Sequence, residues 1–164
     1  MRVYLPLTVS RLRAAVPTAQ FGAAGEVVFA VTDGLRAEYP GADDDELEYL
    51  AMADAARASL RLLAAEDGPD WLRVVLAADV EGLTPASDLD RAAARLGGTI
   101  PWKRVASVHI DGADAAAVVQ EAAGAVDAAD LGDIDAEYAV GSAEDLDLAW
   151  YGPGEVRFLL EDLS

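Results

Sequence analysis

The amino-acid sequence predicts an α/β (α+β) fold, a two-layer sandwich in which helices pack on a mixed sheet of about four or five strands, ferredoxin-like or related. Continuous apolar runs at 26–32 and 71–80 are typical of strands that are covered on both faces. Helical patterns alternate with these runs along the chain. The half-polar pattern of 104–110 indicates an open sheet face, which favours two layers over the alternative, a small doubly wound sheet. The length fits a single domain, 1–164.

The N-terminal residues predict a strand followed by a short helix. Residues 2–7 place apolar side chains at alternate positions, which indicates a strand. Pro6 cannot donate to a ladder of hydrogen bonds, and it therefore favours an edge position or a strand end. Ser10 is suited to cap a helix over 11–16, which stops before Pro17.

The stretch "GADDDELEYL" at 41–50 places five acids in six positions. Carboxylates in the first turn of a helix are stabilised by its unpaired N–H groups and by the positive end of its dipole. A calcium loop needs ligands at alternating positions and a glycine at its tight turn, and this run has neither. We therefore interpret the run as the start of a helix of about five turns, not as a metal site.

The remaining elements are predicted from helix signals. A helical turn is expected at 33–41, a short helix at 88–96 ended by two glycines, and an alanine-rich helix at 112–129. The acidic stretch 127–147 is expected to be loop with a short helix. Apolar residues at helical spacing predict a final helix after Pro153.

Charge and composition narrow the classes of function. The formal net charge is −18, with an excess of three positive charges in residues 1–25 and of thirteen negative charges in residues 111–164. Such a field repels nucleic acid and anionic membranes and attracts a basic protein or a cation. The alternative interpretation is an organism whose whole proteome is acidic.

The sequence has no Cys and a single His, His109, which excludes disulfides, thiolate chemistry and His-rich metal sites. We interpret His109, two residues after Ser107, as a surface histidine, because catalytic Ser–His pairs come from different elements and need a third, orienting group. The N-terminal segment lacks the features of a signal peptide, and no apolar run is long enough to span a membrane. A cytoplasmic protein is expected.

Three strand-like runs end in an acid, at Asp33, Asp79 and Asp111. In open α/β sheets, ligands bind beyond the carboxyl ends of the strands. If these strands are parallel, the three carboxylates could converge and hold Mg²⁺, which prefers oxygen ligands. The alternative is that Asp33 and Asp111 are N-caps of the following helices and that Asp79 is a loop residue. No other cofactor is expected.

A second candidate site is a surface that binds a protein partner. Trp150 and Tyr151 lie beside a Gly-Pro-Gly turn, and Trp and Tyr are frequent hot-spot residues in interfaces. The alternative is that they pack under the last helix. Asp130, Asp133 and Asp135 represent the acidic stretch that would face a basic partner.

Several blocks of the sequence resemble a family of small, uncharacterised actinobacterial proteins. These blocks cover most of the chain: "MRVYLP" at the start, then "VFAVTDGLRAEYP", "DELEYLAMADAARASLRLL", "RVVLAADV", "SVHID" and "LAWYGPGEVRFLL". The resemblance implies a cytosolic protein of a high-GC bacterium, and it assigns no activity, cofactor or site residue.

Two hypotheses of function follow. The first is a non-enzymatic, acidic protein-binding module that engages a basic partner through the C-terminal third. The alternative is an enzyme that is Mg²⁺-dependent or binds a small molecule, built on the three strand-end carboxylates. Whether the protein is an enzyme stays open at this stage, and so does its oligomeric state.

Overall fold

The structure of the protein, a computed structural model, describes residues 1–163. Within these residues, a seven-stranded sheet has the strand order β5-β6-β3-β1-β4-β8-β9, and a separate two-stranded ribbon pairs β2 with β7. Neighbouring strands are antiparallel in each of these pairs. The predicted α+β class is confirmed, and the sheet is larger than the four or five strands expected.

The elements have the following bounds. The large sheet contains β1 (Arg2–Leu7), β3 (Val27–Ala30), β4 (Val74–Asp79), β5 (Thr84–Pro85), β6 (Ala93–Arg95), β8 (Val105–Ile110) and β9 (Ala149–Tyr151), and the ribbon contains β2 (Gln20–Phe21) and β7 (Ile100–Pro101). The helices are α1 (Val9–Ala15), α2 (Asp33–Glu38), α3 (Asp44–Ala65), α4 (Ala116–Asp130), α5 (Ile134–Glu144) and α6 (Val156–Asp162).

The first strand lies at the centre of the sheet. β1 pairs with β4 along its whole length, with Leu5 opposite Leu76, whereas its pairing with β3 ends at Tyr4. Pro6 lies beyond that point, which agrees with the predicted strand end but not with an edge strand, since a proline has no N–H to continue a ladder.

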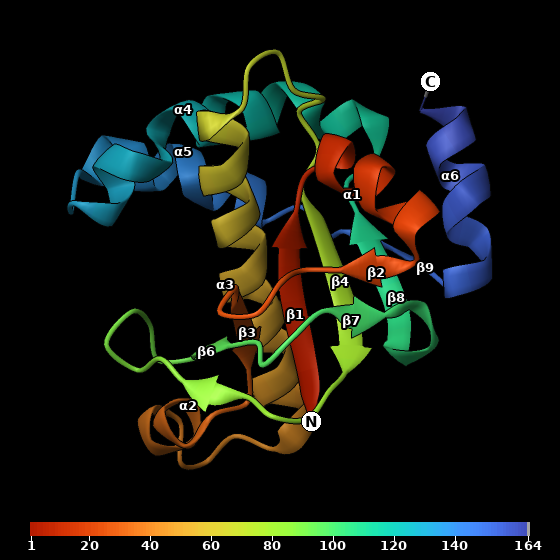
Figure 1. The fold of residues 1–164 in the computed structure, drawn as a ribbon. Coiled ribbons are helices and arrows are strands. Elements are labelled where there is room, and N and C mark those ends of the chain that lie inside the picture. The colour runs from red at the N-terminus through yellow and green to blue at the C-terminus, as the bar shows by residue number, and fades with distance from the viewer. Residues whose placement is uncertain (164) are drawn as a thin grey trace.

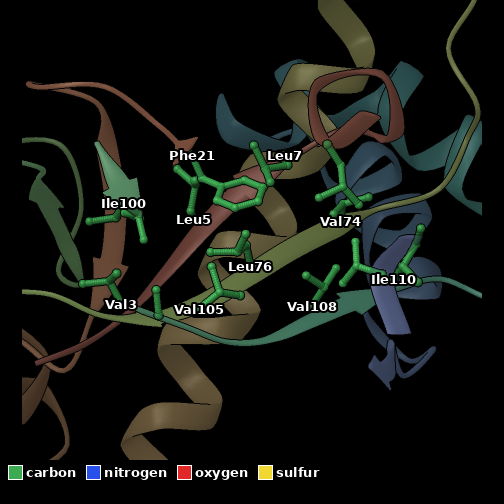
Figure 2. Packing of buried hydrophobic residues seen from close by; sticks show 14 of the residues in the cluster. Val3, Leu5, Leu7, Phe21, Val74, Leu76, Ile100, Val105, Val108 and Ile110 are labelled. Atoms are coloured by element: carbon green, nitrogen blue, oxygen red, sulfur yellow. The ribbon is translucent and has the colours of Figure 1, made fainter. Parts of the chain in front are cut away.

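One face of the sheet carries the largest apolar core (Figure 2). Alternate residues of the central strands, among them Leu5, Leu76 and Val108, meet Phe21 of β2 and Ile100 of β7 on this face. Helices α1 and α6 also cover it, contributing further buried side chains. Removing this much apolar surface from water is the main stabilising contribution to the fold.

The opposite face packs against α3. Tyr4, Phe29 and Val75 point to this side and contact the buried stripe of the helix, which includes Leu47 and Ala51. Farther along α3, Leu60 and Leu63 join a third apolar cluster with α4 and α5. In Figure 1 these two helices lie across the end of α3, and the turn between them extends away from the sheet.

Both faces of the sheet are therefore covered, which differs from the two layers expected with one open face. The half-polar face of β8 is not open, because Ser107 is 4% exposed and His109 is half-buried. The predictions of a mixed sheet and, as the alternative, of a doubly wound sheet are also wrong, because the observed strand pairs are antiparallel.

The predicted helix at 88–96 is wrong. The alanines that suggested it form β6 and the residues before it, and Ala93 is buried opposite Phe29 of β3. Alanine has the highest intrinsic helix propensity, but pairing with a neighbouring strand can override a preference of less than about 1 kcal/mol per residue.

The predicted helix start in the acidic run is confirmed. Asp43 is the N-cap of α3, and its carboxylate accepts a hydrogen bond from the N–H of Glu46 at 2.9 Å. Asp44 and Asp45 follow in the first turn. The capping bond satisfies one of the orphan donors of the helix.

Candidate functional site

The α4–α5 hairpin lies across the end of α3, at the periphery of the structure (Figure 1). Its turn has Gly132 at φ +95°, a conformation that favours glycine because it has no Cβ. The carboxylate of Asp133 then accepts a hydrogen bond from the N–H of Ala136 at 2.9 Å and caps α5. The chain thus turns sharply after α4, and α5 begins with a capped first turn.

One side of α5 is buried. Val140 and Ala143 are 0% exposed, and they pack with Val126 of α4 and Leu63 of α3 in the third apolar cluster. This side fixes the orientation of the helix relative to the rest of the protein, because an amphipathic helix is held mainly by its packed face.

The other side of α5 carries an exposed stripe of five residues, of which Gly141 is partly buried and Asp145 is the C-cap. Positions spaced three and four apart lie on one face of a helix, and here they form a line: Ile134, Tyr138, Gly141, Ser142 and Asp145. Ile134 and Tyr138 are 84% and 82% exposed, and Leu131 in the adjoining turn is 90% exposed. Large apolar side chains presented to water in this way make this side of α5 a candidate interaction surface.

A groove of about 630 Å³ runs along the exposed stripe. Ala129 of α4 and Gly132 of the turn line one end of the groove, while Glu144 and Asp145 line the other. Because Gly141 has no side chain, and a Cβ added there would meet nothing within 4 Å, the groove stays open in its middle. The stripe can therefore accept a partner that lies close to the helix backbone.

Arg57 of α3 ties the hairpin to the body. Its guanidinium donates to Asp130 of α4 at 3.0 Å and to Glu137 and Glu144 of α5 at 2.9 and 3.1 Å. Arg61 also donates to Asp130, at 2.7 Å. A planar guanidinium can serve several carboxylates at once because its five N–H groups point in fixed directions.

These contacts shift the pKa values of the groups in the network. The hydrogen bond from Arg61 lowers the pKa of Asp130, and that from Arg57 lowers the pKa of Glu137. The same bonds raise the pKa of Arg57. Each shift has the same cause, since a hydrogen bond to the charged form, together with a nearby opposite charge, favours ionisation.

The three predicted acids of the partner surface therefore have different roles. Asp130 is committed to the arginine network, and Asp133 is a helix cap. Asp135 is exposed in the first turn of α5. Part of the acidity of the stretch thus stabilises the hairpin, and the remainder faces solvent.

The aromatic pair lies elsewhere, on the edge strand β9. Trp150 is 61% exposed and stands opposite His109, whereas Tyr151 is partly buried against the main core. The structure thus separates these two residues from the acids of the hairpin. Sequence analysis missed Leu131, Ile134 and Tyr138, although three apolar residues within an acidic stretch were a usable signal.

The three strand-end carboxylates are dispersed. β4 and β8 are antiparallel, with Val74 opposite Ile110, so Asp79 and Asp111 lie at opposite ends of the sheet. Asp79 pairs with Arg2 at 2.9 Å, and this hydrogen bond lowers its pKa. Among residues 1–163, no three His, Cys, Asp or Glu side chains gather where a metal ion could be held.

Asp33 and Asp111 are not helix caps either. The N-cap of α2 is Thr32, whose hydroxyl accepts a hydrogen bond from Leu35, and Asp33 follows it in the first turn. Asp111 has a completely buried side chain that receives bonds from Arg73 at 2.7 to 2.9 Å.

Ser107 and His109 form a hydrogen bond of 2.9 Å on the face of β8. Burial, followed by the charge of Arg2, lowers the pKa of His109, which favours the neutral ring. The Ser107 side chain is buried, so it cannot reach a substrate as a nucleophile in this conformation.

Comparison with known proteins identifies the family. No curated protein and no solved structure matches the chain. None of the helices described in residues 1–163 combines the length and the apolar character that a membrane span requires. Over residues 1–160, the sequence matches a family described as a family of unknown function, DUF6912. The chain belongs to this family.

Proposed function

We propose that this protein is a non-enzymatic binding module that engages a basic protein partner through the α4–α5 hairpin. The observation that carries the proposal is the exposed stripe of α5, with Ile134 and Tyr138 more than four-fifths exposed on a helix whose opposite side is fixed in the core. Covering exposed apolar side chains of this size with a partner contributes a favourable free energy of binding.

The negative charge of the hairpin supports a positively charged partner. No lysine or arginine occurs between Arg104 and Arg157, and the hairpin lies within that interval. Asp145 of the stripe, Asp135 of α5 and Asp127 of α4 are exposed and have no ion pair among the described residues. A partner with basic residues beside an apolar ridge would complement this surface in both charge and polarity.

The geometry favours a helical segment as the element that docks. A groove along one helix, with apolar residues at one end and a glycine in the middle, accepts the apolar face of an amphipathic helix. A basic amphipathic helix would place its apolar residues against Ile134 and Tyr138 and its cations near Asp135 and Asp145. An actinobacterial origin and a cytoplasmic location belong to the same proposal.

Affinity capture with matched variants tests this function. The bait is the full chain, compared with the double variant Ile134→Ala/Tyr138→Ala and with Phe158→Ala, which removes an exposed aromatic (68%) from α6 instead. We expect a basic protein to be retained by wild type and Phe158→Ala, to be lost with the double variant, and to elute at moderate salt, since exposed charges are screened within about 8 Å at physiological ionic strength.

The proposal fails if the double variant retains the same proteins as wild type. It also fails if the captured protein is acidic, or if its retention is independent of salt. Folding of each variant is checked by urea denaturation, where substitutions at such exposed positions are expected to change stability by no more than about 0.5 kcal/mol.

A further inference from the structure

A second cavity, separate from the exposed stripe, opens where β1 and β3 diverge. It has a volume of about 630 Å³ and lies between α3 and the strands β1, β3 and β6. The pairing of β1 with β3 ends at Tyr4, and Pro6, two residues farther along, lines the cavity. A space of this size accommodates a small molecule.

The floor and one rim of the cavity are apolar. Phe29 and Ala93 are buried at its base, and Ala58 and Leu62 line it from α3. Leu89 stands at the rim with 53% of its surface exposed. An apolar ligand body would cover these side chains and remove Leu89 from water.

The charged residues of the cavity are not equally available. Arg61 and Asp130 neutralise each other in an ion pair of 2.7 Å. Glu26 also lines the cavity, and its Oε2 is buried near Gly22 with no hydrogen-bond partner among the described residues. Arg11 is exposed to solvent. Asp90 lines the cavity and forms no ion pair among the described residues, and its Oδ1 accepts a hydrogen bond from the N–H of Ala92 at 2.9 Å.

The surroundings of Asp90 carry excess negative charge. Asp54 on α3 lies close enough for Asp90 to contribute to its raised pKa of about 6, although burial is the larger cause. The nearby cation, Arg91, is shared between Asp54 and Glu38 at 3.3 and 2.9 Å. Two carboxylates thus share one guanidinium while Asp90 lies near Asp54, and a further cation would relieve the repulsion between Asp90 and Asp54.

We propose that this cavity binds a small amphipathic amine, with the ammonium group on Asp90 and the apolar body on Phe29, Leu62 and Ala93. An ammonium group donates up to three hydrogen bonds, which suits a carboxylate at the edge of an apolar floor. A bare metal ion suits it less, because such ions need several oxygen ligands and the floor has none. The net charge of −18 further concentrates cations near the protein.

Three probes with the same eight-carbon chain separate charge from apolar contact. Octylamine, octanol and octanoate are titrated into ¹⁵N-labelled full-length protein, and the affected amides are mapped by NMR. We expect octylamine to perturb the amides of Val27, Phe29 and Ala93 and to bind at least tenfold more tightly than octanoate, with octanol between them.

Two pairs of variants test the two halves of the site. Asp90→Asn is expected to weaken octylamine at least tenfold and to leave octanol unchanged, while Asp88→Asn, an exposed carboxylate in the same loop, has little effect. Ala58→Leu fills the cavity and is expected to abolish binding of all three probes, whereas Ala64→Leu on the exposed side of α3 does not.

Each of the following results overturns the proposal. These results are that octanoate binds as tightly as octylamine, that the perturbed amides lie outside the cavity, or that Asp90→Asn and Asp88→Asn have equal effects. Because Asp90 and Ala58 are distant in sequence from α5 and line a different cavity, failure here leaves the proposed protein-binding function untouched.

Discussion

The buried ion pair between Arg73 and Asp111 offers the sharpest test of the fold. Their side chains are 3% and 0% exposed. The Asp111 oxygens accept bonds from Nε, Nη2 and the backbone N–H of Arg73 at 2.9, 2.8 and 2.7 Å. The same guanidinium also donates to the carbonyl of Leu146 at 3.0 Å. The pair therefore connects β4 with the ends of β8 and α5.

Asp111→Asn keeps the shape of the side chain and removes its charge, which leaves the guanidinium of Arg73 buried and uncompensated. Breaking a buried pair in this way costs about 3–5 kcal/mol, a large fraction of the roughly 5–15 kcal/mol that stabilises a domain. Arg73→Met is expected to have a similar cost. The double variant Arg73→Met/Asp111→Asn is expected to cost less than the sum of the two single changes, because it leaves no unpaired charge.

Urea denaturation of the four proteins gives the free energies of unfolding and the coupling between the two positions. A cost below about 1 kcal/mol for Asp111→Asn, or additivity of the two single changes, would refute this interpretation of the pair. Adding millimolar Mg²⁺ provides an independent check. If Asp111 bound the ion, Mg²⁺ would stabilise wild type by mass action, and we expect no such shift.

Four further predictions concern other charged groups. Arg57→Met is expected to destabilise the hairpin by about 1–2 kcal/mol, discounted for partial exposure, which faster hydrogen exchange of α5 amides would reveal; unchanged exchange would contradict it. The lowered pKa values of Asp130 and Glu137 make their stabilisation fully present above their ordinary pKa values and lost as pH falls through the lowered ones. Wild type should therefore approach Arg57→Met in stability as pH falls through these lowered values. The pKa of Asp54 is raised to about 6, so between about pH 4 and 6 the folded chain holds a proton that the unfolded chain releases. Stability should therefore fall by up to about 3 kcal/mol as pH rises through this range. Asp54→Asn should flatten this part of the plot of urea midpoint against pH, and an unchanged slope would count against the assignment. The lowered pKa of His109 should appear directly in a proton NMR titration, where the single imidazole titrates below its usual 6.5; a value at or above 6.5 would disagree with the structure.

The central strands and α3 could be predicted from sequence because each has a strong local signal. Continuous apolar runs marked β4 and β3, and the alternating pattern marked β1. The carboxylates from Asp43 onward marked the start of α3, where the structure places the capping bond. These signals depend only on residues that are close in sequence, so they can be recognised without knowledge of the tertiary structure.

Other features depend on partners that are distant in sequence. β6 reads as a helix because alanine-rich segments have high helix propensity, and only its pairing with β3 reveals a strand. The arginine network joins Arg57 to residues 73 to 87 positions away. Asp111 was expected to be a metal ligand or a cap, and its actual partner, 38 positions away, could not be identified from a local pattern.

Site-specific photo-crosslinking at position 138 tests the central claim most directly. A photoreactive phenylalanine analogue replaces Tyr138 in one variant and Phe158 in the control, and crosslinked peptides are identified by mass spectrometry from cells of the source organism. We predict a crosslink from position 138 to a basic, helical segment of one partner protein, and no crosslink to that protein from position 158. Absence of a product at position 138, or the same products from both positions, would contradict the assignment of the α4–α5 hairpin as a docking surface.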